Sequence, residues 1–379
     1  MKKIKSKIGF LVLLIAICMF PVCANAASPE AKIGNKNYKT LQEAVNAVKN
    51  GQTIKVLRNI SVKRKGTMTP DFDGGIKSTK NVKCTIDLCK HTIKIEGKDF
   101  FYGMFLCKKG NVTIKNGTFK GVVKIEKNAV VTLQQLKMIK TGYVSVDNYG
   151  RVYLKKVSAS NLRINGWKKS KTYLNNCTLT SKNHLFYGTG GDLSITGGKY
   201  TGKAESKGGS SIPLIWITYG KLNISSGNFS SENSYVLHTE STAVTIKSGT
   251  FSSGDNATAF FGKDFDDTSG KLARVIISGG TFTSKQKESG GSFRNTVAIA
   301  GVDAKITGGK FLSYSDRPGS ETIDFSSGKL RITGGYFYSK SGPAVNIWLS
   351  AGDSSFTQTG GSFKTDNKDS EAIRDYRNR

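Results

Sequence analysis

A short alternation of apolar and polar residues recurs along most of this chain. Clear copies read VTIKNGTF, LSITGGKY, VTIKSGTF and LRITGGYF, at 112–119, 193–200, 244–251 and 330–337. In each copy an aliphatic residue lies between polar neighbours, small residues follow, and an aromatic residue comes five positions after the aliphatic one. The period of two predicts a strand with one face toward a core. The paired small residues predict a turn, because positive φ costs glycine little.

The spacing of these copies predicts a stacked architecture. The central aliphatic residues recur every 19 to 31 residues, and they are Ile86, Ile114, Leu133, Leu154, Leu174, Ile195, Ile224, Ile246, Ile277, Ile306 and Ile332. Self-similarity at this period is typical of a solenoid, in which each coil packs mainly on its neighbours. We therefore predict an all-β solenoid of about 12 coils. The aromatic residue of each copy should stack on its neighbours inside the coils.

An earlier strand in each later coil predicts a second outward column. In TIDFS, at 322–326, Ile323 and Phe325 should point inward and Asp324 outward, eight residues before Ile332. The same offset on other coils selects Tyr187, Trp216, His238 and Ala298 as outward residues. An aromatic column of this kind either stacks on a ligand or lies under a loop.

The two ends of the chain differ from the repeats. Residues 1–26 have a lysine-rich head, an apolar run and a small-residue site at 24–26, which predicts a signal peptide. Residues 27–80 are predicted to form an N-terminal cap with a helix that starts at a Thr40–Glu43 capping box, and 81–379 the solenoid. No later apolar stretch is long enough to span a membrane. SEAIRDYRNR, at 370–379, begins another strand with Ala372 and Ile373, so a second chain can be expected to dock at this edge unless the basic tail blunts it.

Three motifs carry a resemblance to a known group of proteins. The helix-then-strand opening TLQEAVNAVKNGQTIKVL, at 40–57, is followed by TIDLCKHTI, at 85–93, and then by the Gly-Gly-x-aromatic repeats. This order resembles secreted right-handed parallel β-helix proteins of the broad pectate-lyase-like superfamily, as found in Gram-positive bacteria. The resemblance implies the fold, while the fold hosts unrelated activities. Cys89 and Lys90 stand where the phrase usually has Asn-Gly.

Charge and cysteine content narrow the class of partner. The formal net charge is +30, and removal of residues 1–26 leaves +26 because that segment carries four lysines and no acid. A secreted protein with this charge is expected to meet anionic glycans or wall polymers, whereas nucleic acid is less accessible outside the cell. Solubility alone is the competing explanation. The pairing of Cys84, Cys89, Cys107 and Cys177 stays open, with one bridge expected among the first three.

The candidate binding site lies where the repeat pattern degenerates. Residues 148–191 contain no acid and many lysines and arginines, and Tyr153 and Tyr173 occupy one outward column on neighbouring coils, with Trp167 in the turn between them. Aromatic rings flanked by cations suit sugars that bear acidic groups. The predicted ligand-binding residues are Tyr153, Tyr173, Trp167, Arg151, Lys155, Arg163, Lys169 and Lys171. A solvated basic surface with packed tyrosines explains the same residues equally well.

Catalysis and metal binding have weaker support in the sequence. Calcium prefers about six to eight oxygen ligands, and Asp264, Asp266 and Asp267 supply carboxylates from one loop only. A glycosidase needs two carboxyl groups about 5–10 Å apart, and no pair on neighbouring coils is evident. His238 is a candidate base without an evident acid beside it. We therefore expect non-catalytic glycan binding without a cofactor, with a polysaccharide lyase or hydrolase that uses acids at 262–324 as the first alternative and an adhesin as the second.

Overall fold

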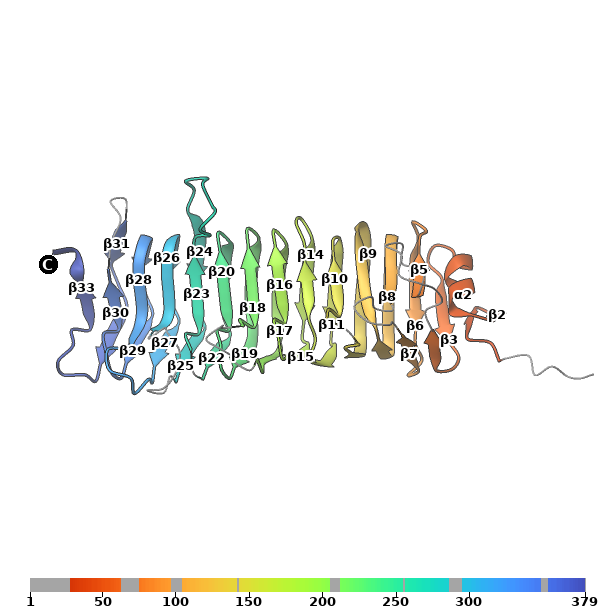
Figure 1. Ribbon diagram of the computed structural model, residues 1–379, viewed down its shortest axis with the longest axis horizontal. Coiled ribbons are helices and arrows are strands. Elements are labelled where there is room, and N and C mark those ends of the chain that lie inside the picture. Colours follow the sequence, from red (N-terminus) through yellow and green to blue (C-terminus); the bar gives the residue numbers. More distant parts are fainter. Residues whose placement is uncertain are drawn as a thin grey trace, which may run out of the picture.

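The computed structural model describes residues 28–62, 75–96, 104–141, 143–204, 212–254, 256–285, 295–348 and 354–378. The predicted signal peptide at 1–26 lies outside these ranges. The described chain is an all-β protein whose strands stack in parallel along one long axis, from the N-terminal end at the right of Figure 1 to the C-terminal end at the left. The strand pairing closes in a ring-like pattern that is compatible with a β-helix.

The strands form three faces, which are named here in the order in which the chain visits them. The first face holds β5 (Gly75–Ser78), β10 (Val146–Asn148), β13 (Ile164–Gly166), β16 (Phe186–Thr189), β18 (Ile215–Thr218), β20 (Leu237–Glu240), β23 (Ala259–Gly262), β30 (Val345–Ile347) and β33 (Ile373–Asp375). The second face holds β3 (Thr53–Val56), β6 (Lys83–Asp87), β11 (Arg151–Lys155), β14 (Lys171–Asn175), β21 (Ala243–Ile246), β24 (Ala273–Ile277) and β31 (Ser355–Gln358).

The third face holds β4 (Ile60–Val62), β7 (Thr92–Ile95), β12 (Ser158–Ser160), β15 (Thr178–Ser181), β22 (Thr250–Ser253), β25 (Thr281–Ser284), β27 (Lys310–Ser313), β29 (Tyr336–Ser339) and β32 (Ser362–Thr365). Six longer strands continue from one face to the next: β8 (Met104–Lys120), β9 (Val122–Ile139), β17 (Asp192–Gly202), β19 (Lys221–Ser231), β26 (Asn295–Ile306) and β28 (Glu321–Ile332). Only β1 (Ala31–Ile33) pairs antiparallel in the described residues, with β2 (Lys36–Tyr38) and β3.

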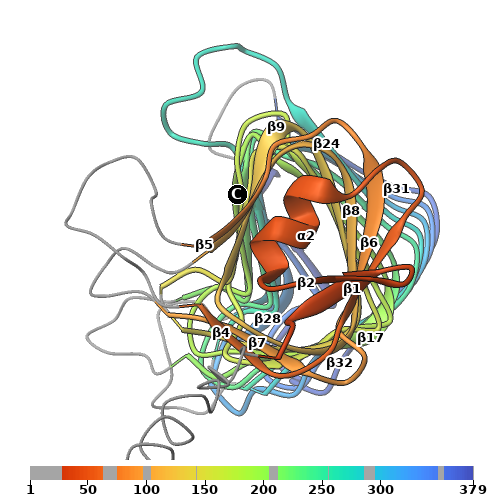
Figure 2. The same cartoon turned by 90° about the vertical axis from the view of Figure 1, so that its right-hand side faces the viewer.

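The helix α2 (Leu41–Ala47) lies over the N-terminal end of the stack (Figure 2). Its N-cap is Thr40, whose side chain accepts a hydrogen bond from the Glu43 backbone N–H at 3.2 Å. Leu41, Ala44 and Val45 are buried on the side of the helix that packs against the first strands. At the other end, the strand predicted at Ala372 and Ile373 is present: Ile373 of β33 pairs with Val345 of β30, and the 3₁₀ helix η1 (Tyr376–Asn378) follows.

The predicted interior column of aromatic residues is confirmed. On the third face, consecutive rings lie 4.5–5.0 Å apart, centroid to centroid, with interplanar angles of at most 16°. The stacked rings are Tyr200, Phe229, Phe251, Phe282, Phe311, Phe337 and Phe363. Parallel in-register strands place equivalent side chains one strand spacing apart, so each flat ring covers the next and excludes water from the core.

All four cysteines in the described residues are free thiols, so the bridge expected among Cys84, Cys89 and Cys107 is not formed. Cys84, Cys107 and Cys177 are buried, and burial raises the pKa of each of them. Cys89 is exposed, with a φ of 49°, and Lys90 has a φ of 71°. The backbone at this turn is therefore left-handed, a conformation that asparagine and glycine adopt at lower cost than cysteine and lysine.

Candidate functional site

The centre of the candidate site is a pair of tyrosines on the second face. Tyr153 on β11 and Tyr173 on β14 are register partners, and both side chains are half-buried and point outward. Their ring centroids lie 4.6 Å apart with an interplanar angle of 9°. The predicted side-by-side arrangement is thus confirmed. The neighbouring residues of the same column are Thr132 and Ser194, so the two rings stand above the small side chains on either side.

Three cations surround this pair. Arg151 and Lys155 lie two residues before and after Tyr153, and Lys171 lies two residues before Tyr173, so all three share the outward face. All are exposed, and the Lys155 ammonium lies 5.8 Å from the Tyr153 ring centroid. None of the three has an ion-pair partner in the described part of the chain. The charges are therefore available to an external anion.

The stacked geometry limits how the tyrosines can recognise a ligand. Each ring covers one face of the other, so a sugar ring has no space between them. The exposed parts are the ring edges, the outer faces and the hydroxyl groups, which donate and accept hydrogen bonds. The arrangement can therefore hold a polar polymer through hydroxyl hydrogen bonds between the cations.

Trp167 lies in the turn between β13 and β14, but its side chain belongs to the first face. It stacks on Tyr149 with centroids 5.7 Å apart, and its indole N–H donates to the Asp147 carboxylate at 2.5 Å. Burial raises the pKa of Asp147, which this hydrogen bond and Lys124 partly offset. Trp167 is thus engaged with Tyr149 and Asp147 rather than with the tyrosine pair.

Arg163 is also separate from the tyrosine pair, because it is buried on the first face. Its Nε donates to Asn165 Oδ1 at 3.0 Å, and its guanidinium lies over the rings of Tyr143 and Tyr187, at 4.2 and 5.4 Å from their centroids. Lys169 is exposed in the same turn as Trp167, with a φ of 68°. The structure therefore brings together five of the eight predicted residues: Tyr153, Tyr173, Arg151, Lys155 and Lys171.

The predicted aromatic column on the first face is present and longer than the sequence indicated. Tyr187, Trp216, His238 and Phe260 are register partners on four successive strands, followed by Ala298 and Asp324. The offset of eight residues missed Phe260 because residues 263–272 lengthen the connection to the next strand. The column is half-buried, since residues just before the strands pack on it: His184 contacts Tyr187 and Trp216, and Tyr235 contacts His238.

His238 has an acid partner that the sequence reasoning missed. Its Nε2 lies 3.0 Å from Oε1 of Glu240, and this hydrogen bond is the main reason that the pKa of Glu240 is lowered. Glu240 lies two residues further along β20, so strand parity alone places it on the same face. Trp216 and Phe260 flank the imidazole at centroid distances of 5.2 and 4.7 Å. A histidine oriented by a carboxylate is a chemical arrangement suited to proton transfer.

The carboxylates of two candidate metal ligands, Asp264 and Asp267, accept hydrogen bonds from neighbouring groups. Asp264 Oδ1 accepts from the Asp266 backbone N–H at 2.9 Å, and Asp267 accepts from the Ser241 hydroxyl at 2.6 Å. The Ser241 hydrogen bond is the main reason that the pKa of Asp267 is lowered to about 2. Among the residues with described positions, no group of three or more His, Cys, Asp or Glu side chains is arranged to hold a metal ion.

Comparisons with known proteins leave the family open. No family model matches the chain, and no similar curated protein or solved structure was found. The resemblance to pectate-lyase-like proteins therefore depends on the sequence phrases and on the strand arrangement. In the described ranges, no helix is both long and apolar enough to cross a membrane.

Proposed function

We propose that this protein is a secreted, non-catalytic binder of an anionic polysaccharide or cell-surface glycan, and that binding centres on Tyr153 and Tyr173. The observation that supports this proposal is the stacked tyrosine pair bracketed by three exposed cations that have no ion-pair partner among the described residues. Arginine and lysine form charge-assisted hydrogen bonds with carboxylate and sulfate groups, which are stronger than neutral ones. The tyrosine hydroxyls would bind sugar hydroxyls between these charged contacts.

The proposed scaffold is a right-handed β-helix of about 12 coils, with α2 as its N-terminal cap and residues 1–26 removed on secretion. The parallel register over three faces and the position of α2 support this. A long stack suits an extended polymer, because equivalent surface residues recur at about 4.8 Å along its axis. Membership of the pectate-lyase-like superfamily is part of the same proposal.

Replacing both tyrosines with alanine tests the assignment of the site. The Tyr153→Ala/Tyr173→Ala variant should bind a uronate polymer or a sulfated glycan about 5- to 150-fold more weakly, because two hydrogen-bonding side chains of about 0.5–1.5 kcal/mol each are lost. Isothermal titration calorimetry or glycan-array binding measures this. The matched control is Lys305→Ala/Arg331→Ala, which removes two exposed cations from the same outward column farther along the stack. Equal binding by the tyrosine variant and the unchanged protein would refute the site.

A polysaccharide lyase or hydrolase is the second candidate, and it is favoured by the His238–Glu240 pair beside Trp216. The imidazole would act as a base whose orientation Glu240 fixes, on a sugar held by the neighbouring rings. Incubation with uronate polymers, with and without calcium, distinguishes the two functions. A rise in unsaturated or reducing sugar ends that is abolished by His238→Gln would favour the enzyme. If the reaction also required calcium, the aspartates at 264–267 would again be candidate calcium ligands.

A further inference from the structure

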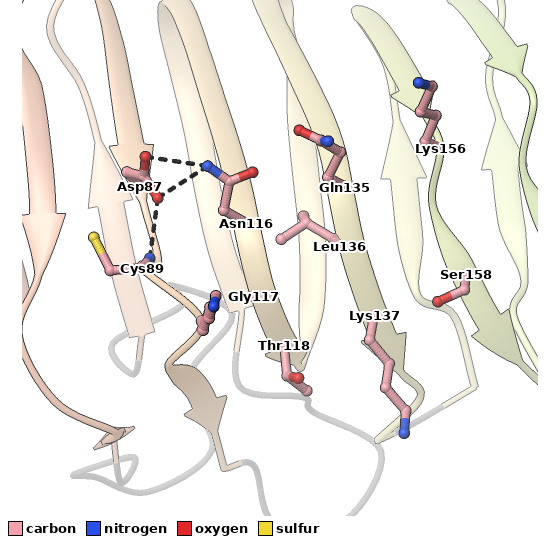
Figure 3. A pocket seen from close by; sticks show the side chains of 11 residues that line it. Asp87, Cys89, Asn116, Gly117, Thr118, Gln135, Leu136, Lys137, Lys156 and Ser158 are labelled. Carbon is pink, nitrogen blue, oxygen red and sulfur yellow. Dashed lines mark hydrogen bonds between the residues drawn. The ribbon is translucent and has the colours of Figure 1, made fainter.

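A shallow groove of about 810 Å³ follows the bend between the second and third faces (Figure 3). It crosses four successive coils, and each coil contributes the residues that leave its second-face strand. The lining residues are Asp87, Cys89, Lys90, Asn116, Gly117, Thr118, Gln135, Leu136, Lys137, Lys156 and Ser158. Three strand spacings separate the first coil from the last, so the groove extends about 14 Å along the axis of the stack.

The backbone holds this groove in a fixed shape. Asn116, Gln135 and Lys156 occupy the same position after their second-face strands and have left-handed φ angles of 60°, 50° and 52°, so three equivalent turns repeat one above the other. The turn that follows β6 is longer, and there Cys89 has a φ of 49°. At Gly117 a Cβ atom would lie 2.5 Å from the Leu88 Cβ and from the His91 carbonyl oxygen. A side chain at this position would clash, so the glycine keeps the wall of the groove close to the turn before it.

The groove carries a net positive charge. Lys90, Lys137 and Lys156 line it, and none of them has an ion-pair partner in the ranges that the structure describes. The acid that lines the groove, Asp87, is already satisfied: it accepts from the Cys89 N–H at 3.0 Å and from Asn116 Nδ2 at 3.2 Å, and Lys115 lies 3.5 Å away. Burial raises the pKa of Asp87, but these contacts outweigh burial and hold it below its usual value. Asp87 therefore stays charged and engaged, and the lysines are left for an external anion.

The groove is continuous with the tyrosine pair. Lys155 lies beside the Tyr153 ring, and the next residue, Lys156, lines the groove on the same coil. We propose that this groove is a second subsite, which takes a carboxylate or sulfate group of the same linear polymer that contacts Tyr153 and Tyr173. This inference rests on the proposed glycan-binding function. It adds the expectation that one extended anionic chain runs along the axis from the coil of Asp87 to the coil of Tyr173.

The exposed thiol of Cys89 lets the occupancy of the groove be measured directly. Cys84, Cys107 and Cys177 are buried, so the difference in iodoacetamide labelling between the unchanged protein and Cys89→Ser reports on Cys89. The reagent is uncharged, so it is not itself attracted by the lysines. With a short uronate oligosaccharide at about ten times its dissociation constant, roughly one site in eleven stays free, and labelling should slow about tenfold. A sulfated oligosaccharide forms a second arm, which shows which acidic group the groove takes.

A lysine variant supplies the matched test. Lys137→Ala/Lys156→Ala should abolish the protection of Cys89 while the Tyr153–Tyr173 surface still binds the oligosaccharide. Neither lysine is among the charges that shift the pKa of Cys89, which are Asp87, Lys55 and Lys115, so the intrinsic labelling rate should stay the same. The control variant Lys305→Ala/Arg331→Ala should keep full protection.

The outcomes separate this inference from the proposed function. Binding that depends on the tyrosines but leaves Cys89 labelling unchanged in both arms would overturn the groove and leave the proposed function standing. Protection that persists in the Lys137→Ala/Lys156→Ala variant would also overturn it, because shielding would then come from elsewhere. Absence of binding to either oligosaccharide would overturn the proposed function, and the groove subsite with it.

Discussion

At the scale of single residues, the burial of His184 makes the stability of the fold depend on pH. It packs beside Tyr187 and Trp216 on the first face, and its Nδ1 lies 2.8 Å from the Pro213 carbonyl oxygen, to which it donates. Burial, with smaller contributions from Arg163 and His238, lowers the pKa of His184 to about 4. Protonation therefore favours the unfolded chain, whose histidines titrate near pH 6.5.

We predict that the stability of the protein falls as the pH is lowered from about 6.5 to 4, and that His184 contributes up to about 3 kcal/mol to this fall. The stabilisation is fully present above the pKa of the unfolded state and is lost as the pH falls through that of the folded state. His184→Asn, which keeps an N–H donor, should have a shallower pH dependence in urea unfolding. An unaltered slope in His184→Asn would contradict the assignment.

Single residues also mark the limit of what the sequence could predict about the site. Tyr153, Tyr173 and their flanking cations lie within strands, where the period of two fixes the direction of each side chain. Trp167 and Arg163 lie in or next to turns, and their directions depend on turn conformation and on partners from other coils, Asp147 and Tyr187. Glu240 was predictable from parity, since it follows His238 by two residues on one strand.

At the scale of elements, the interior aromatic column links the coils of the third face. Phe282 is fully buried and stacks on Phe251 and Phe311, at centroid distances of 4.5 and 5.0 Å. Phe363 is half-buried and stacks on Phe337 alone in the described residues. A ring in the middle of the column therefore has a partner on both faces, and the last ring has one.

Phe282→Ala should lower the free energy of unfolding by about 3–5 kcal/mol, because it removes a buried ring and leaves a cavity between two others. Phe363→Ala should cost clearly less, since its ring is already partly exposed to water. Guanidinium unfolding followed by circular dichroism and by tyrosine and tryptophan fluorescence measures both variants, and the two signals show whether the stack unfolds as one unit. Equal losses in the two variants would contradict the continuous column.

The strand register was predictable for physical reasons that the turns do not share. A slip of one residue would turn every buried aliphatic residue outward, so the alternating pattern specifies the register strongly. The offset between two strands of one coil depends on the length of the connection instead. It holds for Tyr187, Trp216 and His238, and it misses Phe260, where residues 263–272 intervene. The continuous bending of β8 and β9 from face to face has no comparable signal in the sequence.

At the scale of the whole molecule, the proposed glycan site and the candidate catalytic pair lie on different faces and on different coils. The tyrosine pair and the groove both lie on coils formed by residues 83–175, on or beside the second face. The aromatic column with the His238–Glu240 pair lies on the first face of later coils. The proposed glycan site and the candidate catalytic pair are therefore separate surfaces, and a variant of one should leave the other unaffected.

The overall charge predicts that glycan affinity depends strongly on salt concentration. The local site predicts which variants change this dependence. Raising the ionic strength from about 0.1 M to 1 M shortens the Debye length from about 10 Å to about 3 Å, so glycan affinity should fall steeply for the unchanged protein. Removing the local cations, as Arg151→Ala/Lys155→Ala/Lys171→Ala, should weaken binding at low salt and flatten the dependence. Tyr153→Ala/Tyr173→Ala should weaken binding at both salt concentrations and keep the slope, because hydroxyl hydrogen bonds are not screened in this way. If Lys305→Ala/Arg331→Ala flattened the slope as much as the local triple variant, attraction would come from the net charge of the whole protein and not from a site on β11 and β14.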